Sequence, residues 1–311
     1  MKQAVLLLAH GSPDSPAEVP EFLLNITGGR PLPPPVVEEV RRRYSLIGRS
    51  PLTEITLKQA DGTAKLLGLP VYVGMRNWRP CTADAVNQMT ADGIEQAVVI
   101  CLAPQNSRTS VGLYRTALEQ AEPKFVYEFV ENWHDHPLLI QAFAERLERD
   151  WKRACDAAGI RVPVIFTAHS VPQRTIEGGD PYEEQARQTA DMVAMEVPSL
   201  SMDQYTFAFQ SQGMSGGPWL GPTVEDTILK LKEQGHQGVF LQPIGFVCDH
   251  VEVLYDIDIG FRKFAAENGM LLWRAESLND SPTLCAAIAD IARSVLSKPE
   301  PNRQVMQIKG M

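Results

Sequence analysis

Short apolar runs alternate with amphipathic segments along the whole chain. Apolar runs of this length between turn residues predict strands buried on both faces, and apolar residues at helical spacing predict helices between them. Helices are expected at 137–154, 181–197 and 223–232, and strands at 4–9, 70–75, 97–102, 126–130, 162–166, 204–210, 239–242 and 271–275. Strands that alternate with helices predict an α/β fold with parallel sheets and right-handed crossovers.

The ends of corresponding strands repeat between the two halves of the chain. The first strand ends in AHGSP at 9–13, and its counterpart ends in AHSVP at 168–172. Both fourth strands lead into the pattern Glu-x-x-x-Asp-x-Pro and then into a helical pattern. Self-similarity of this kind indicates two units of like structure. We predict four β-α units in each half, at 1–155 and 156–296, and a loose polar tail at 297–311.

The two halves differ in length directly after His10. The first two strands start 66 residues apart in the first half but 41 residues apart in the second, which indicates an insertion of 25 residues. We place it within about 13–50, a segment that includes a basic helix at 36–44 with Arg41, Arg42 and Arg43. An insertion at the carboxyl edge of a parallel sheet predicts a lid over the cleft.

Composition narrows the classes of function. The 311 residues have a net charge of −9, which argues against a nucleic-acid partner. No apolar run approaches the roughly 18 residues that would span a bilayer, and the first run is too short for a signal peptide. The five cysteines are widely spaced and form no C-x-x-C pair, which favours a reducing compartment. We expect a cytoplasmic protein and leave peripheral membrane contact open.

Candidate chemistry gathers where the strands of the second half end. His169 follows a buried strand, at the edge where parallel α/β sheets bind ligands, although an ordinary hydrogen-bonded histidine fits this stretch equally well. If a helix begins at Asp249, then Asp249, Glu252 and Asp256 lie on one of its faces. A carboxylate face beside a histidine suits a divalent metal path or proton transfer. An acidic first turn favoured by the helix dipole is the alternative for the first two.

Several segments resemble motifs of the ferrochelatase family. TAHSVP at 167–172 resembles SAHSLP, DHVEVLYD at 249–256 resembles DHIETLYE, and YVGMRNWRP at 72–80 is similar to Y-x-G-x-R-Y-x-x-P. QS at 210–211, PWLGP at 218–222 and ESLN at 276–279 match as well. The resemblance runs from about residue 4 to 296. It implies two Rossmann-like halves with the active-site cleft between them, and insertion of Fe²⁺ into a porphyrin in haem biosynthesis.

The resemblance also implies roles for particular residues. His169 and Glu252 would be the catalytic pair, and His169, Glu252 and Asp256 the metal-contacting side chains. A histidine suits proton acceptance near neutral pH, and carboxylates suit a hydrated divalent cation. The porphyrin-contacting positions carried over from the family are His10, Arg30, Arg43, Tyr44, Arg49, Ser50 and His134. Arginines suit the propionate groups of a porphyrin, although arginines at 41–43 also fit a solvated helix face.

The chain departs from the family pattern at some positions. His10 replaces a tyrosine of a Gram-positive group that makes coproheme, and a histidine there suits either iron ligation from the face opposite His169 or a simple loop hydrogen bond. Gly260 stands where some members continue the acidic face. The four C-terminal cysteines that hold an iron–sulfur cluster in some members are absent, so we expect no cluster and no tightly bound cofactor, with Fe²⁺ as a substrate.

Two further functions and two substrates stay open at this stage. A cobalt or nickel chelatase of a corrin-type precursor would share the two-half architecture, and a haem carrier would bind haem without making it. The long motif matches favour the ferrochelatase. Its substrate is coproporphyrin III or protoporphyrin IX and its product the corresponding haem, with the arginine-rich lid slightly favouring coproporphyrin III.

Overall fold

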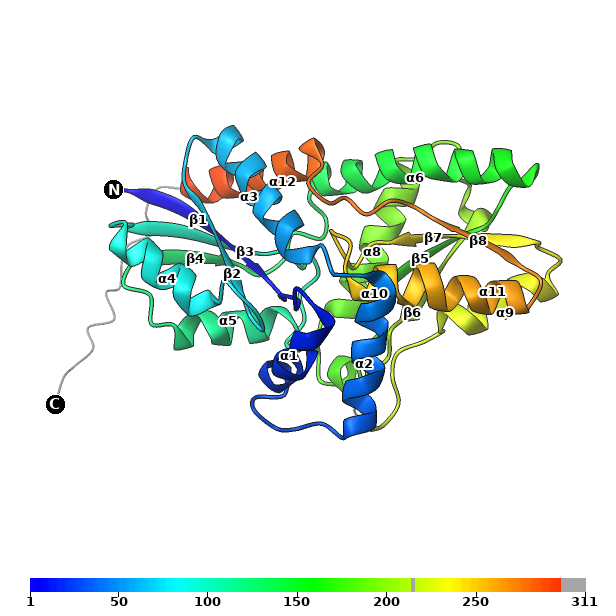
Figure 1. Ribbon diagram of the computed structural model, residues 1–311. Helices are drawn as coiled ribbons and strands as arrows, with labels where there is room; N and C mark the ends of the chain where they lie inside the picture. The colour runs from blue at the N-terminus through cyan, green and yellow to red at the C-terminus, as the bar shows by residue number, and fades with distance from the viewer. Residues whose placement is uncertain (214–215, 298–311) are drawn as a thin grey trace.

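The computed structural model describes residues 1–213 and 216–297, so the predicted tail lies outside it apart from Ser297. It contains two four-stranded parallel sheets with the same topology (Figure 1). The first has the order β2-β1-β3-β4, with β1 (Gln3–Ala9), β2 (Val71–Met75), β3 (Gln96–Cys101) and β4 (Val126–Val130). The second has the order β6-β5-β7-β8, with β5 (Val164–His169), β6 (Tyr205–Gln210), β7 (Gly238–Pro243) and β8 (Leu271–Arg274). The predicted α/β class with two four-stranded halves is confirmed.

The central strand of the first sheet is buried on both faces, which explains its unbroken apolar sequence. Leu6 and Leu8 of β1 pack under α4 (Thr82–Ala91) and α5 (Val111–Gln120). Val5 and Leu7 point to the opposite face and join a core that also contains Phe166 of β5. Alternate residues of one strand therefore belong to two cores, and one of these cores runs through both halves.

Two helices cross between the halves. α6 (Pro137–Ala158) follows the first sheet in the chain but packs against β7, β8 and α8 (Tyr182–Met195). α12 (Pro282–Leu296) follows the second sheet but packs against β3 and α3 (Leu52–Leu67). Figure 1 shows green α6 over the second sheet and orange α12 beside α3. The boundary predicted at residue 155 therefore does not separate the packing units, because a sequence repeat cannot tell which sheet a helix covers.

The remaining elements of the second half are short. They are α7 (Gln173–Glu177), the 3₁₀ helix η2 (Met202–Gln204), α9 (Val224–Glu233), α10 (Val251–Leu254), the π-helical segment η3 (Asp256–Phe261) and α11 (Arg262–Glu267). Among residues 1–213 and 216–297, no helix has both the length and the apolar character that crossing a membrane requires.

The segment inserted after His10 forms the 3₁₀ helix η1 (Pro16–Glu18), α1 (Val19–Ile26) and α2 (Pro34–Ile47). The sequence sets both ends of α2, because proline suits a first turn and Gly48 adopts a φ of 81° that favours glycine. α2 contacts α10 of the second half, and both inserted helices lie below the junction of the two sheets in the view of Figure 1. This is the place where a lid is predicted.

Two local predictions are corrected by the structure. β5 starts and ends later than its apolar run, because Pro163 has no N–H to donate and His169 still pairs with Gln210 of β6. His169 is thus the last residue of the strand, in agreement with its predicted place where a buried strand meets a loop. The helix expected from Asp249 begins only at Val251, so Asp249 does not share a helical face with Glu252.

Candidate functional site

A cavity of about 590 Å³ opens at the carboxyl ends of both sheets. Residues at six strand ends line it, namely His10 after β1, Arg76 after β2, Leu102 after β3, His169 on β5, Ser211 after β6 and Gly245 after β7. The inserted helices add a wall of six side chains, Phe22, Leu23, Ile26, Val40, Arg43 and Tyr44. Its position is the one at which parallel α/β sheets bind ligands, and its volume suits a small organic molecule.

His169 ends β5 with both ring nitrogens facing oxygen atoms. Nδ1 contacts the backbone carbonyl of Ser170, and Nε2 lies 3.5 Å from Oε1 of Glu252. The hydroxyl of Tyr182 donates a hydrogen bond of 2.9 Å to the backbone carbonyl of His169, which ties the strand end to α8. The imidazole is therefore held in one orientation on the cavity wall.

Glu252 lies between two histidines near the start of α10. Its Oε1 faces His169, and its Oε2 lies 3.4 Å from Nε2 of His250. Nδ1 of His250 in turn lies 3.0 Å from the backbone carbonyl of Cys248. The side-chain amide of Gln210 donates a hydrogen bond of 3.0 Å to the backbone carbonyl of Glu252. The end of β6 thus fixes the place of the helix that carries this carboxylate.

Burial and charge act in opposite directions on this cluster. Burial alone would lower the pKa of His169, but the negative charge of Glu252 and its hydrogen bond hold that pKa above the ordinary value. Burial alone would raise the pKa of Glu252, but the charge of His169 and the hydrogen bonds from both histidines hold it well below the usual range. Around neutral pH the carboxylate of Glu252 is therefore ionised.

Asp256 lies one turn beyond Glu252, in η3, and also lines the cavity. The hydroxyl of Ser211 donates a hydrogen bond to its Oδ2, and Nη1 of Arg43 lies 3.6 Å from its Oδ1. Burial raises the pKa of Asp256, and the hydrogen bond from Ser211 offsets this only in part. Arg43 also pairs with Glu39 at 3.0 Å, so its charge is divided between two carboxylates.

The three residues predicted to contact metal, His169, Glu252 and Asp256, share one wall of the cavity. In the described part of the chain, no three His, Cys, Asp or Glu side chains lie close enough together to hold a metal ion. The structure thus brings these donors together without assembling them into a three-ligand site.

His10 stands on the wall supplied by the first half and is held as a neutral imidazole. Its Nδ1 lies 3.0 Å from the backbone carbonyl of Gly11, and its Nε2 accepts a hydrogen bond of 3.0 Å from the side-chain amide of Asn77. Burial and the positive charge of Arg76 lower the pKa of His10 to about 4. His10 therefore keeps an unprotonated nitrogen through the neutral pH range.

Comparison with known proteins shows the family to which the chain belongs. The family model described as Ferrochelatase matches residues 2–296. The chain belongs to the ferrochelatase family. A ferrochelatase of Acidobacterium capsulatum is 54% identical and covers 96% of this chain and 98% of its own length. A ferrochelatase of Deinococcus radiodurans is 39% identical, with coverages of 92% and 94%. A coproporphyrin III ferrochelatase of a Geobacillus species is 33% identical, with coverages of 93% and 96%.

The enzyme is accordingly a porphyrin iron chelatase of haem biosynthesis, a lyase that inserts Fe²⁺ into the ring. Solved structures show the same two-half fold. SirB from Bacillus subtilis with Fe³⁺ has a TM-score of 0.59 at 11% identity and covers 96% of both chains. CbiX, described as the terminal enzyme of sirohaem synthesis in denitrifying bacteria, has a TM-score of 0.54 at 16% identity and covers 94% of this chain and 100% of its own. At such identities they show the fold alone, and the family match decides against the corrin-type alternative.

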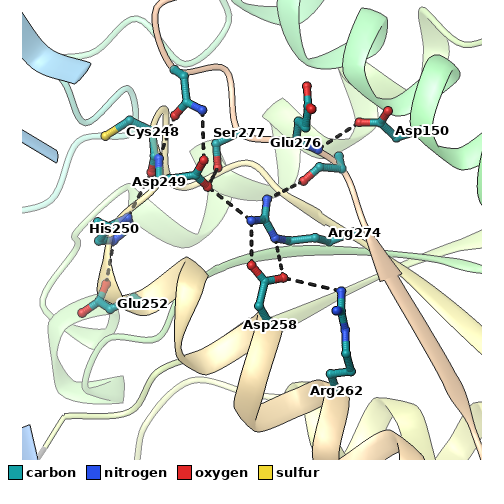
Figure 2. A network of polar contacts seen from close by, with 12 residues as sticks. Asp150, Cys248, Asp249, His250, Glu252, Asp258, Arg262, Arg274, Glu276 and Ser277 are labelled. Carbon is teal, nitrogen blue, oxygen red and sulfur yellow. Dashed lines mark hydrogen bonds and ion pairs between the residues drawn. The ribbon is translucent and has the colours of Figure 1, made fainter. Parts of the chain in front are cut away.

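The segment that carries Glu252 is held in place by Arg274, at the end of β8 (Figure 2). The guanidinium of Arg274 donates two hydrogen bonds of 2.8 Å to the carboxylate of Asp258 in η3. It also reaches Asp249, ahead of α10, at 3.4 Å. Asp249 accepts further hydrogen bonds from Ser277 at 2.8 Å and from Asn279 at 2.9 Å. This network explains why Asp249 lies away from the cavity, and it fixes both ends of the segment that carries Glu252.

Replacing Arg274 should both destabilise the enzyme and slow it. Arg274→Met leaves Asp249 without its cation and leaves Asp258 only the exposed Arg262. Breaking a buried ion pair costs on the order of 3 kcal/mol. We expect that loss in urea unfolding, together with a lower kcat, because Glu252 and Asp256 lose their support.

Arg262→Met is the matched control, since Arg262 is exposed and lies 3.7 Å from the same Asp258. It should cost less than about 1 kcal/mol. Equal effects of the two substitutions would contradict the positioning role of Arg274.

Three of the residues that the family resemblance predicts to contact porphyrin line the cavity, namely His10, Arg43 and Tyr44. Tyr44 is buried, and its hydroxyl lies 3.1 Å from Oγ of Ser12, a residue that lines the same cavity. Burial raises the pKa of Tyr44, so its hydroxyl stays protonated at neutral pH. The structure therefore brings these three together from β1 and the inserted helices.

The other two arginines do not line the cavity. Arg30 is exposed between α1 and α2, and its Nε donates a hydrogen bond of 3.2 Å to the backbone carbonyl of Thr27. Arg49 is exposed before α3 and pairs with Glu54 at 2.5 Å. Their proposed porphyrin contacts are corrected in this respect, since position in a basic segment does not determine which way a side chain points.

Ser50 and His134 are also outside the cavity lining. Ser50 is buried, and its Oγ accepts a hydrogen bond of 3.4 Å from the N–H of Leu52 at the start of α3. His134 is buried between the halves, with Nε2 2.9 Å from Oε1 of Gln188 on α8. In this structure both side chains serve packing between elements and do not face the site.

His250 and Arg76 line the cavity but were not predicted as site residues from the sequence. Both lie inside the motifs DHVEVLYD and YVGMRNWRP, so the signal was present. Gln105 and Tyr114 also line the cavity but come from a segment without a recognised motif. Only the fold brings that segment to the ends of the strands.

Proposed function

We propose that this ferrochelatase acts on coproporphyrin III and that His169 and His250, which both face Glu252, accept the two protons that Fe²⁺ displaces from the ring. The observation that carries the proposal is the place of Glu252 on the cavity wall between two imidazoles. Metallation removes two pyrrole protons, so the site needs acceptors for both, within reach of the bound ring.

Hydrogen positions in the cluster support a capacity of two protons. Nδ1 of His169 and Nδ1 of His250 each face a backbone carbonyl, which favours a hydrogen on each of these nitrogens. A neutral imidazole then has a lone pair on Nε2, and both Nε2 atoms face Glu252. One proton fits between each Nε2 and its carboxylate oxygen. In our proposal the cluster starts as two neutral imidazoles and a carboxylate and ends as two imidazolium ions and a carboxylate.

The other ionisable residues of the lining have separate proposed roles. Asp256 and Glu252 supply oxygen donors along which hydrated Fe²⁺ would reach the ring, since hard divalent ions prefer carboxylates. His10 would meet the metal from the first half of the chain as a neutral nitrogen ligand. It must then exchange its hydrogen bond from Asn77 for the iron. A pKa of about 4 suits His10 to ligation and makes it a poor proton acceptor at neutral pH.

The choice of porphyrin rests on charge in the cavity. Coproporphyrin III has four propionates and protoporphyrin IX has two, and Arg43 in the lining suits a carboxylate. Relatives named coproporphyrin III ferrochelatase match 93–96% of this chain at 33–35% identity, which also supports this substrate. The exposed positions of Arg30 and Arg49 remove part of the argument drawn from the lid.

Turnover of the two porphyrins tests the substrate directly. We expect a higher kcat/KM for coproporphyrin III than for protoporphyrin IX, at equal monomer concentration in the same detergent under anaerobic Fe²⁺. This ratio reports discrimination in the transition state. A clear preference for protoporphyrin IX would overturn the substrate and leave the proton-accepting cluster standing. Haem binding without metallation of either porphyrin would mean a carrier.

We also propose a cytoplasmic location, because all five cysteines are free thiols. Peripheral membrane contact is a separate proposal. It is supported by exposed Leu24 and Ile26 on α1, the helix whose Phe22 lines the cavity. Co-sedimentation with lipid vesicles, compared between the native protein and Leu24→Ser, tests it.

A further inference from the structure

Arg76 is a cation in the cavity lining that has no anionic partner among residues 1–213 and 216–297. It follows β2 directly, and its backbone N–H donates to the carbonyl of Ala9 at the end of β1. Its side chain is partly buried, and its Nε is shielded from solvent with no hydrogen-bond partner. No carboxylate of the described residues forms an ion pair with Arg76. A guanidinium in such a place is costly unless something else neutralises it.

The neighbour of the Arg76 side chain in the first half is an aromatic ring. The guanidinium lies over the ring of Tyr114, 5.6 Å from its centroid. The segment 107–114 contributes four hydroxyl-bearing residues to the cavity lining, namely Ser107, Thr109, Ser110 and Tyr114. Hydroxyl groups and a guanidinium are hydrogen-bond donors suited to a carboxylate.

Other arginines near the site already have partners. Arg43, which lines the cavity too, pairs with Glu39 and lies near Asp256. Arg79 follows Arg76 by three residues, pairs with Glu21 at 2.7 Å and stays outside the lining. Arg76 is thus the arginine of the lining whose charge the described residues leave uncompensated, and the ligand is the remaining source of negative charge.

We propose that Arg76 binds a propionate carboxylate of the porphyrin and so anchors the ring in the half of the cavity that His10 lines. The inference rests on the porphyrin chelatase function and deepens it by assigning a specificity residue. It does not depend on which porphyrin is preferred, because both candidates carry propionates. A bidentate pair with a planar guanidinium would also fix the orientation of the ring.

Porphyrin fluorescence titration of Arg76→Met tests the proposal. Coproporphyrin III and its tetramethyl ester are compared in the same detergent, because the ester keeps the ring and loses the charges. A hydrogen bond to a charged group contributes about 1.5–3 kcal/mol, which corresponds to about 10- to 100-fold in Kd. We expect that loss for the acid and less than about twofold for the ester. Arg76→Lys, which keeps the charge, should retain part of the affinity.

Arg79→Met is the matched control, as a neighbouring arginine outside the lining, and it should leave both dissociation constants unchanged. An equal loss for acid and ester would mean that Arg76 only shapes the cavity, and no loss for either would mean that it does not touch the ligand. Both results overturn the proposal. If Arg76→Met does not fold, Arg76→Gln is measured in the same way. If the native protein metallates porphyrin normally but the variants give one of these two results, the role of Arg76 is refuted and the chelatase function stands.

Discussion

His169→Ala should reduce metallation of porphyrin by about 10²- to 10⁴-fold, the usual contribution of a positioned general base. The substitution removes one of the two imidazoles that face Glu252 and leaves a carboxylate whose low pKa makes it a poor proton acceptor. Porphyrin affinity should change little, because His169 is one of many side chains that line the cavity. Stopped-flow absorbance with Fe²⁺ under anaerobic conditions measures the rate.

The pH dependence of the native enzyme follows from the same residue. His169 must be unprotonated to accept a proton, and its pKa lies above the ordinary value. The rate should therefore fall as pH decreases through that raised pKa, with kcat/KM levelling off above it. Protonated His169 paired with ionised Glu252 also stabilises the fold, and this contribution is lost as pH rises through the folded-state pKa of His169.

His236→Ala is the control for a histidine at the opposite edge of the second sheet, just before β7. It should keep the native rate and the native pH profile. Near-normal turnover of His169→Ala would contradict the assigned role, provided that thermal unfolding shows both variants folded.

Glu252→Gln should remove most of the activity, by about 10²-fold or more, while porphyrin still binds. The amide keeps the shape of the side chain but cannot stabilise two imidazolium ions. Without the negative charge the pKa of His169 falls, so the acid limb of the residual rate should move to lower pH. Rate and porphyrin affinity are measured separately, by single turnover and by fluorescence titration.

Glu267→Gln, an exposed change at the end of α11, serves as control for loss of one negative charge. A Glu252→Gln enzyme that loses porphyrin binding but metallates bound substrate at the native rate would show that Glu252 holds the ring and does not take part in proton transfer. An unshifted acid limb would mean that the carboxylate does not set the pKa of His169.

The sequence alone determined the class of fold and the strands that carry the site. Unbroken apolar runs such as β1 bury all of their side chains only in a sheet that is covered on both faces. The parallel α/β architecture therefore follows from the pattern. The repeated AHxxP pattern placed His10 and His169 at equivalent strand ends, and both line one cavity. Motifs of several residues in fixed order were sufficient to identify the family, since each is read locally along the chain.

The tertiary structure alone determined the contacts between segments that are far apart in the sequence. Asp249 shares a motif with Glu252 but turns away to Arg274, because that guanidinium comes from a strand 25 residues later. The exchange of α6 and α12 between sheets leaves no trace in a sequence repeat. Arg76 lines the cavity and forms no ion pair with the described residues, whereas Arg79, three residues later, pairs with Glu21 outside the lining. Whether an arginine is paired depends on tertiary packing, which the local sequence pattern does not contain.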